Sequence, residues 1–259
     1  MKKIIKIFLV LFMLIPMVVN ADYYEVEDSD IIVDMGERWF VFTRGNIKNN
    51  KDLDTLGVSY EYMFNYFLQN ENVVVDAITL TSSDYIELLV YKERINDITN
   101  LSLYSEEELK EYAKEVSDTR ECDSAGVLSL ESNYNKEITS YIKCSRYVDN
   151  KYVYEFLTIV NNDIYLFQFQ KDNKFSDSDI EISNTAIRNV HFNVKKRVEK
   201  EDQVIKDFKS KDDSILIRAL IGALTGAAVG GACAFILYIV KKFKNDDDNN
   251  DEDNGNNNS

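Results

Sequence analysis

The hydrophobic periodicity of the chain changes several times, and each change marks a new predicted element. Two short apolar runs, Ile31 to Met35 and Arg38 to Thr43, flank Met35-Gly36-Glu37, which is the pattern of two strands joined in a hairpin. Apolar residues then recur at every third or fourth position of SYEYMFNYFLQNE, which predicts an amphipathic helix. The residues of its apolar stripe are Tyr60, Met63, Phe64, Phe67 and Leu68.

Further strands and helices follow in a regular order. Two strands are predicted in NVVVDAITL and DYIELLVYKE. A helix is predicted in SEEELKEYAKEVSD, where Ser105 and Glu108 form a capping box at its start. Four more strands are predicted in AGVLSLES, EITSYIKCSRYV, KYVYEFLTIV and DIYLFQFQ. The last two are joined at Asn161-Asn162, because asparagine tolerates the positive φ of a tight hairpin turn. A final helix, SDSDIEISNTAIRNV, is predicted to end near His191 and Phe192.

This order predicts an α+β domain with a mostly antiparallel sheet and packed helices. Several short segments carry a resemblance to a known family. They are MGERWFVFTRGN, NENVVVDAITL, SEEELK and YVYEFLTIVNNDIYLFQFQ, with a last helix ending in VHF. In these segments the chain resembles the PsbP-like extracytoplasmic domains of Gram-positive bacteria. The resemblance covers Ile31 to Phe192, although relatives usually carry a proline in the first turn, where this chain has Met35-Gly36. It implies a twisted antiparallel sheet covered by helices, and a binding or accessory role in place of a shared reaction.

Apolar stretches near both ends of the chain predict export and membrane anchoring. Residues 1–21 contain three lysines, an apolar run and small residues before Asp22, which is the pattern of a cleaved signal peptide. Residues 215–240 predict a transmembrane helix, since an uncharged stretch of about 22 residues can cross a hydrocarbon core of ~30 Å. Two alternatives remain open: an uncleaved N-terminal anchor, and a buried core helix in place of the transmembrane helix.

These segments predict a single-pass protein of the cell membrane, with its N-terminal domain outside and its C-terminus in the cytoplasm. The orientation rests on the signal peptide. An extracytoplasmic domain (22–193) is followed by a charged stalk (194–214), the transmembrane helix and a tail (241–259). The tail begins with basic residues that stop transfer of the chain across the membrane, and its acidic, Asn-rich remainder is expected to be disordered.

The extracytoplasmic part is strongly acidic. Residues 22–213 hold 23 of the 30 Lys and Arg and 39 of the 45 Asp and Glu, a net charge of −16. Such a field repels nucleic acid and other polyanions and favours cationic partners. Solubility at the cell surface is the preferred explanation of this charge, and a function that depends on the charge is the alternative.

The sequence indicates no catalytic residue, cofactor or metal site. His191 is the single histidine and is expected to be structural. Asp177, Asp179 and Glu181 form an acidic run that suits a helix N-terminus better than Ca²⁺. Aromatic residues at strand or helix spacing, such as Tyr60 and Phe64, are expected in the core.

Cysteine residues give a more specific prediction. Cys122 and Cys144 form an even pair in an exported domain, which indicates a disulfide; the alternative is two buried free thiols. A hairpin turning near Tyr134 would bring the two residues close to register.

Small residues recur along one face of the predicted transmembrane helix, where they permit close packing of two helices. They are Gly222, Gly226, Gly230, Ala223, Ala227 and Gly231. This face predicts self-association or docking on another membrane protein; the alternative is a plain anchor. Three functions follow: a surface binding or accessory domain, a regulatory membrane protein that acts through this face, or an exported hydrolase that uses carboxylates or His191.

Overall fold

The computed structural model describes residues 23–36, 38–81, 84–95 and 100–193. The predicted signal peptide, stalk, transmembrane helix and tail lie outside these residues, as do the six small residues of the predicted packing face. Within the described ranges, no helix combines the length and hydropathy that a membrane span needs.

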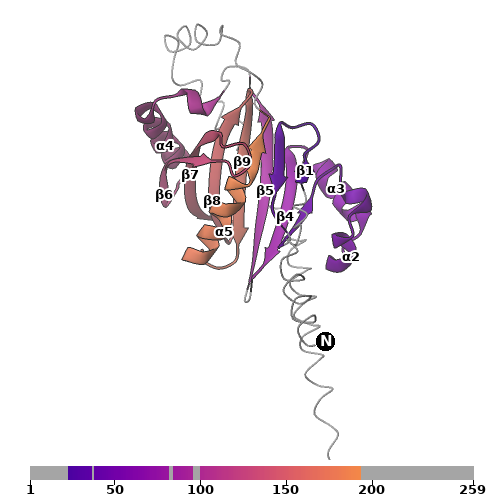
Figure 1. Ribbon diagram of the computed structural model, residues 1–259. Helices are drawn as coiled ribbons and strands as arrows, with labels where there is room; N and C mark the ends of the chain where they lie inside the picture. Colours follow the sequence, from indigo (N-terminus) through magenta and orange to yellow (C-terminus); the bar gives the residue numbers. More distant parts are fainter. Residues whose placement is uncertain (1–22, 37, 82–83, 96–99, 194–259) are drawn as a thin grey trace, which may run out of the picture.

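A seven-stranded antiparallel sheet forms the centre of the domain (Figure 1). Its strand order is β3 (Trp39–Phe42), β4 (Val73–Leu80), β5 (Tyr85–Arg94), β9 (Asp163–Lys171), β8 (Lys151–Val160), β7 (Ile138–Val148) and β6 (Ser124–Glu131). A smaller three-stranded antiparallel sheet has the order β1 (Tyr23–Glu25), β2 (Ile31–Asp34) and β10 (Val190–Phe192). The fold is therefore α+β with antiparallel sheets.

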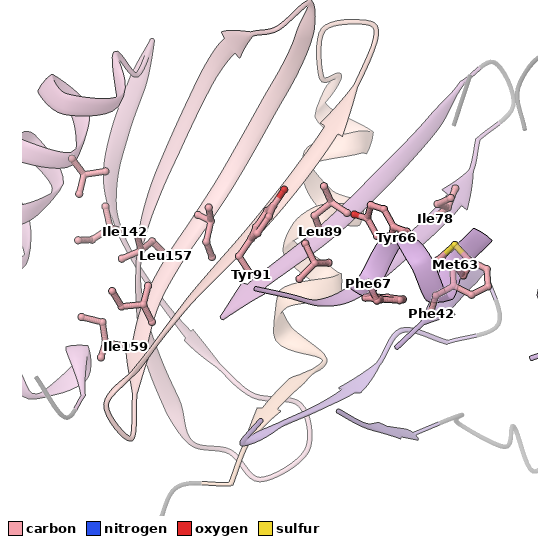
Figure 2. Packing of buried hydrophobic residues seen from close by; sticks show 14 of the residues in the cluster. Phe42, Met63, Tyr66, Phe67, Ile78, Leu89, Tyr91, Ile142, Leu157 and Ile159 are labelled. Atoms are coloured by element: carbon pink, nitrogen blue, oxygen red, sulfur yellow. The ribbon is translucent and has the colours of Figure 1, made fainter. Parts of the chain in front are cut away.

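Helices cover both faces of the large sheet. One face packs against α3 (Tyr60–Gln69) near one edge and α4 (Glu106–Arg120) near the other. The same hydrophobic cluster includes three shorter elements: α2 (Asp52–Leu56) and the 3₁₀ turns η1 (Ile47–Asn49) and η2 (Leu101–Leu103). Figure 2 shows this cluster, from Met63 and Phe67 of α3 to Ile142 and Leu157 on the strands beside α4. The opposite face packs against α5 (Asp177–Arg188) and the small sheet.

Local sequence signals explain where the helices begin. Ser105 caps α4 and Ser176 caps α5, each in a capping box that satisfies two backbone N–H groups at the helix start. Asp179 belongs to the second box and also binds Lys171, with Nζ 2.9 Å from Oδ2. Asp179 therefore has a helix-capping role, and Glu181 of the same acidic run lies 3.4 Å from Arg188. No group of three His, Cys, Asp or Glu among the described residues is placed to hold a metal ion.

The predicted first hairpin is wrong. Both strands exist, but β2 pairs with β1 and β10, whereas β3 pairs with β4 in the large sheet. Gly36, with φ of 71°, lies between them and sends the chain from one sheet to the other. The sequence pattern indicated two strands and a turn, but not the pairing of β2 with β10, which buries Ile31 and Val33 in the same hydrophobic cluster as α5.

The end of the last helix also differs from the prediction. Helix α5 ends at Arg188, and Val190–Phe192 form β10, a strand too short to show a period of its own. The sequence did not indicate β1, α2, η1 or η2, which have three to five residues each.

Candidate functional site

Helix α3 exposes an apolar face to solvent. Its inner side buries Met63, Tyr66 and Phe67 in the core. Its other side exposes large apolar side chains, which we call the outer face of α3. They are Tyr60 (37% exposed), Phe64 (47%) and Leu68 (60%), which are spaced four residues apart and so share one side of the helix. The sequence placed Tyr60, Phe64 and Leu68 in one stripe with Met63 and Phe67; the structure divides this stripe, because only one side of the helix can face the sheet.

A groove of about 470 Å³ lies beside the outer face. Phe64, Phe67 and Leu68 of α3 line it together with Ile47 and Arg44, and we call it the α3 groove. The Arg44 guanidinium lies 6.0 Å from the centre of the Phe67 ring. The groove is therefore apolar on the helix side, and its charged lining residues are one cation, Arg44, and one carboxylate, Glu71.

Arg44 also fixes the end of α3. Its Nη2 donates to the carbonyl oxygens of Phe67 (3.1 Å), Asn70 (3.2 Å), Glu71 (2.6 Å) and Val73 (3.3 Å). The last carbonyls of a helix have no partner within the helix, so a cation at this point satisfies them and complements the helix dipole. The backbone that borders the α3 groove is thus held in place by one side chain.

Two carboxyl groups are buried in the sheet on the side that α3 covers. Asp76 in β4 and Glu87 in β5 are 1% and 0% exposed, and the strand register makes them diagonal neighbours on one face. Gln170 Nε2 donates to Glu87 Oε2, and Gln168 Nε2 donates to Gln170 Oε1 at 3.0 Å. In the described part of the chain, Asp76 Oδ1 and Glu87 Oε1 have no hydrogen-bond partner.

Burial changes the acidity of this pair. Burial, and then the charge of Glu87, raises the pKa of Asp76 well above its usual value. Burial raises the pKa of Glu87 to about 7, although the hydrogen bond from Gln170 and the charge of Lys151 oppose the change. Burial, followed by these two carboxylates, also raises the pKa of Tyr66. A carboxyl group of this kind can act as an acid or base, but the described residues that line the α3 groove include neither Asp76 nor Glu87.

Sequence reasoning missed both carboxyl groups. The available signal was a single charge inside each apolar run, at a position that faces the core when side chains alternate along a strand.

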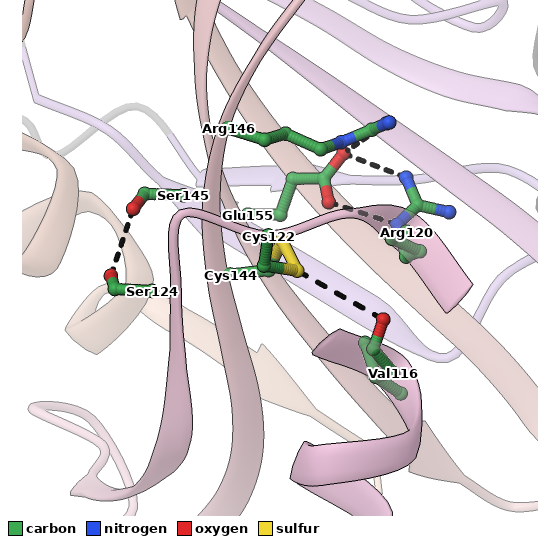
Figure 3. The surroundings of a disulfide bond; sticks show 8 residues. All are labelled: Val116, Arg120, Cys122, Ser124, Cys144, Ser145, Arg146 and Glu155. Atoms are coloured by element: carbon green, nitrogen blue, oxygen red, sulfur yellow. Dashed lines mark hydrogen bonds and ion pairs between the residues drawn. A yellow bond between two sulfur atoms is a disulfide. The ribbon is translucent and has the colours of Figure 1, made fainter. Parts of the chain in front are cut away.

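Cys122 and Cys144 are joined by a disulfide, with Sγ atoms 2.05 Å apart, beside a buried ionic cluster (Figure 3). Glu155 lies opposite Cys144 in the sheet and is 1% exposed. It accepts hydrogen bonds from Arg120 Nη2 at 2.7 Å, Arg120 Nε at 3.1 Å and Arg146 Nη2 at 3.0 Å. Together the two features attach the C-terminal end of α4 to β7 and β8.

His191 is buried, and its contacts hold parts of the fold together. Its Nδ1 lies 2.8 Å from Ser132 Oγ, and its ring lies 4.4 Å from that of Tyr134. Burial lowers the pKa of His191, and the charge of Asp34 opposes this change. The described residues that line the α3 groove include neither His191 nor Ser132. The hydrogen bond between them connects the β6–β7 turn to β10.

Comparisons with known proteins find similarity to solved structures alone. No protein-family model and no curated protein matches the chain. Among solved structures, the chain is similar to the solution structure of cyanobacterial PsbP from Synechocystis sp. PCC 6803, at 12% identity and a TM-score of 0.37. The alignment covers 68% of this chain and 95% of that one. At these values we draw no conclusion about function from the likeness.

Proposed function

We propose that the protein is an exported, membrane-anchored binding domain without a catalytic role, and that it binds a partner protein through the outer face of α3 and the α3 groove. The observation that carries this proposal is the exposure of three large apolar side chains, two of them aromatic, on one face of a helix of ten residues. Burying such side chains stabilises a complex, and aromatic residues dominate binding at protein interfaces.

Charge selects the kind of partner. Residues 22–213 carry a net charge of −16, and the exposed carboxylates Glu61 and Glu71 lie on α3 and directly after it. A second copy of the chain or an anionic membrane would be repelled by this field. A protein with an apolar segment surrounded by lysine or arginine would be attracted by it. We therefore assign the outer face to a partner of that chemistry.

The predicted signal peptide supports a location outside the cell, and the disulfide is of the kind that persists in an oxidising environment. The predicted transmembrane helix would hold the binding domain at the cell surface. Export and anchoring both remain part of the proposal.

Site-specific crosslinking on intact cells tests the proposal. A photoreactive phenylalanine derivative replaces Phe64 in the full chain, and the control chain carries it in place of Lys114, which is exposed on the distant α4. We expect a protein adduct from position 64 and not from position 114. The adduct should disappear with the additional change Leu68→Glu and should weaken as salt is added, because salt screens charge attraction.

Three results would contradict the proposal. An adduct with twice the mass of the chain would identify a second copy, and an adduct with lipid would identify the membrane. Equal yields from positions 64 and 114 would show that the outer face has no special partner.

A further inference from the structure

A second groove, of about 450 Å³, lies on the opposite face of the sheet from the α3 groove. Strands β6, β7 and β8 form its floor, and the start of α5 with the segment before it forms a wall. Tyr154 and Phe175 line it and pack against the hydrophobic cluster under α5. We call it the lysine groove, after Lys143 and Lys174, which both line it.

The strand register places polar groups in a row across the floor. Ser124 of β6 lies opposite Ser145 of β7, which lies opposite Tyr154 of β8, so the three side chains share a face. The two serine hydroxyls are 2.8 Å apart. Lys143 lies opposite Gly126, and a Cβ atom at Gly126 would lie 3.4 Å from Lys143 Cε. The missing side chain therefore lets the lysine stem extend along β6.

Cationic side chains outnumber acidic ones among the described residues that line the lysine groove. Among the described residues, Lys143 and Lys174 form no ion pair, and the hydroxyls of Tyr152 and Tyr154 form no described hydrogen bond. Burial raises the pKa of Tyr154, so its hydroxyl remains a donor. Asp123 is the one acidic side chain among the lining residues described for this groove. The groove is thus a local cationic site in a domain whose overall charge is negative.

We propose that the lysine groove binds a small organic anion, a carboxylate or phosphate group carried on a ring. Lys143 and Lys174 hold the anionic group. The tyrosine hydroxyls donate to it, as does the serine hydroxyl whose proton is not used in the Ser124–Ser145 hydrogen bond, since charge-assisted hydrogen bonds are the strong ones. The rings of Tyr154 and Phe175, whose centroids are 6.0 Å apart, form an aromatic wall against which the ring of the ligand packs. This site is separate from the outer face of α3 and does not depend on the function proposed for it.

Calorimetric titration of the full chain in lipid nanodiscs tests the site. The probes are glucuronate for the carboxylate, glucose 6-phosphate for the phosphate, and glucose as the neutral control. We expect one of the two anionic probes to bind with a Kd of about 1 mM or tighter, and glucose to show no binding. Comparison of the two anions identifies the group that the groove prefers.

Matched variants locate the binding. Lys143→Gln with Lys174→Gln should weaken the anion at least tenfold, because it removes both cations. Lys48→Gln with Lys114→Gln makes the same change in net charge away from the groove and should leave binding unchanged. If the double variant melts at a lower temperature, Lys174→Gln alone provides a second test, because Lys174 is exposed. The proposal is overturned if neither anion binds at 10 mM, or if both double variants weaken binding equally.

Discussion

Asp76 and Glu87 are the residues at which the domain departs most from an ordinary core. Each is fully buried in a central strand, and each has one carboxyl oxygen without a hydrogen-bond partner among the described residues. Burying a charge without a partner costs several kcal/mol, so such a group keeps its proton to a higher pH. The sequence identified the strands that carry these residues but not the residues themselves, because a single charge in an apolar run can face either side of a sheet.

The free energy of unfolding should depend on pH through Glu87. Its pKa rises from 4.5 to about 7 on folding, so between these pH values the folded chain keeps a proton that the unfolded chain has lost. Stability therefore falls as the pH rises through this window, by about 3 kcal/mol from Glu87 alone. Asp76 contributes with the same sign.

Glu87→Gln tests this account. Glutamine has no proton to lose, and its oxygen can still accept from Gln170. Relative to the parent chain, the variant should gain about 3 kcal/mol of stability between pH 4.5 and pH 8, as measured by urea denaturation. Glu107→Gln, at an exposed position on α4, is the control. Parallel profiles for Glu87→Gln and the parent chain would rule out a role for Glu87.

At the scale of elements, the sequence predicted the long helices and strands and failed where tertiary contacts decide. The start of α4 followed from the Ser105 capping box, and the β8–β9 hairpin followed from Asn161-Asn162, with φ of 53° and 67°. Both depend on local chemistry. The separation of β2 from β3, and the exposure of Tyr60 and Phe64 on α3, depend on distant residues and could not be read from periodicity.

The disulfide should stabilise the junction between α4 and the sheet. Cys122 and Cys144 are separated by 22 residues, and in the chain-entropy model closing such a loop contributes about 3 kcal/mol. Replacing both by serine should lower the free energy of unfolding by this amount. On protein taken from the cell surface, an alkylating reagent should modify both residues only after reduction. Alkylation of both without reduction would contradict the oxidised state.

At the scale of the whole molecule, we propose that an acidic binding domain is followed by a predicted membrane anchor. The domain presents a lysine groove on one face of its sheet and an apolar helix on the other. The sequence provided the charge, the fold class and the predicted topology. Neither groove could be predicted from it, because each is lined by residues from several elements far apart in the chain.

The predicted topology has its own test. A membrane-impermeant, amine-reactive reagent applied to intact cells should label lysines of residues 22–213 and leave Lys241, Lys242 and Lys244 unmodified, because the bilayer separates them from the reagent. Peptide mass spectrometry would locate the labels, and lysed cells would serve as the control. Modification of the three tail lysines on intact cells would reverse the orientation.

The central claim is that a partner covers the outer face of α3 at the cell surface. Leu68→Cys places a thiol at the most exposed apolar position of that face, and Lys114→Cys places one on α4 as the control. The measurement is the rate of reaction with an impermeant maleimide, on intact cells and on the purified chain. We predict that position 68 reacts several-fold more slowly on cells than in the purified chain, whereas position 114 reacts at similar rates in both. Equal rates at position 68 in the two preparations would contradict the claim.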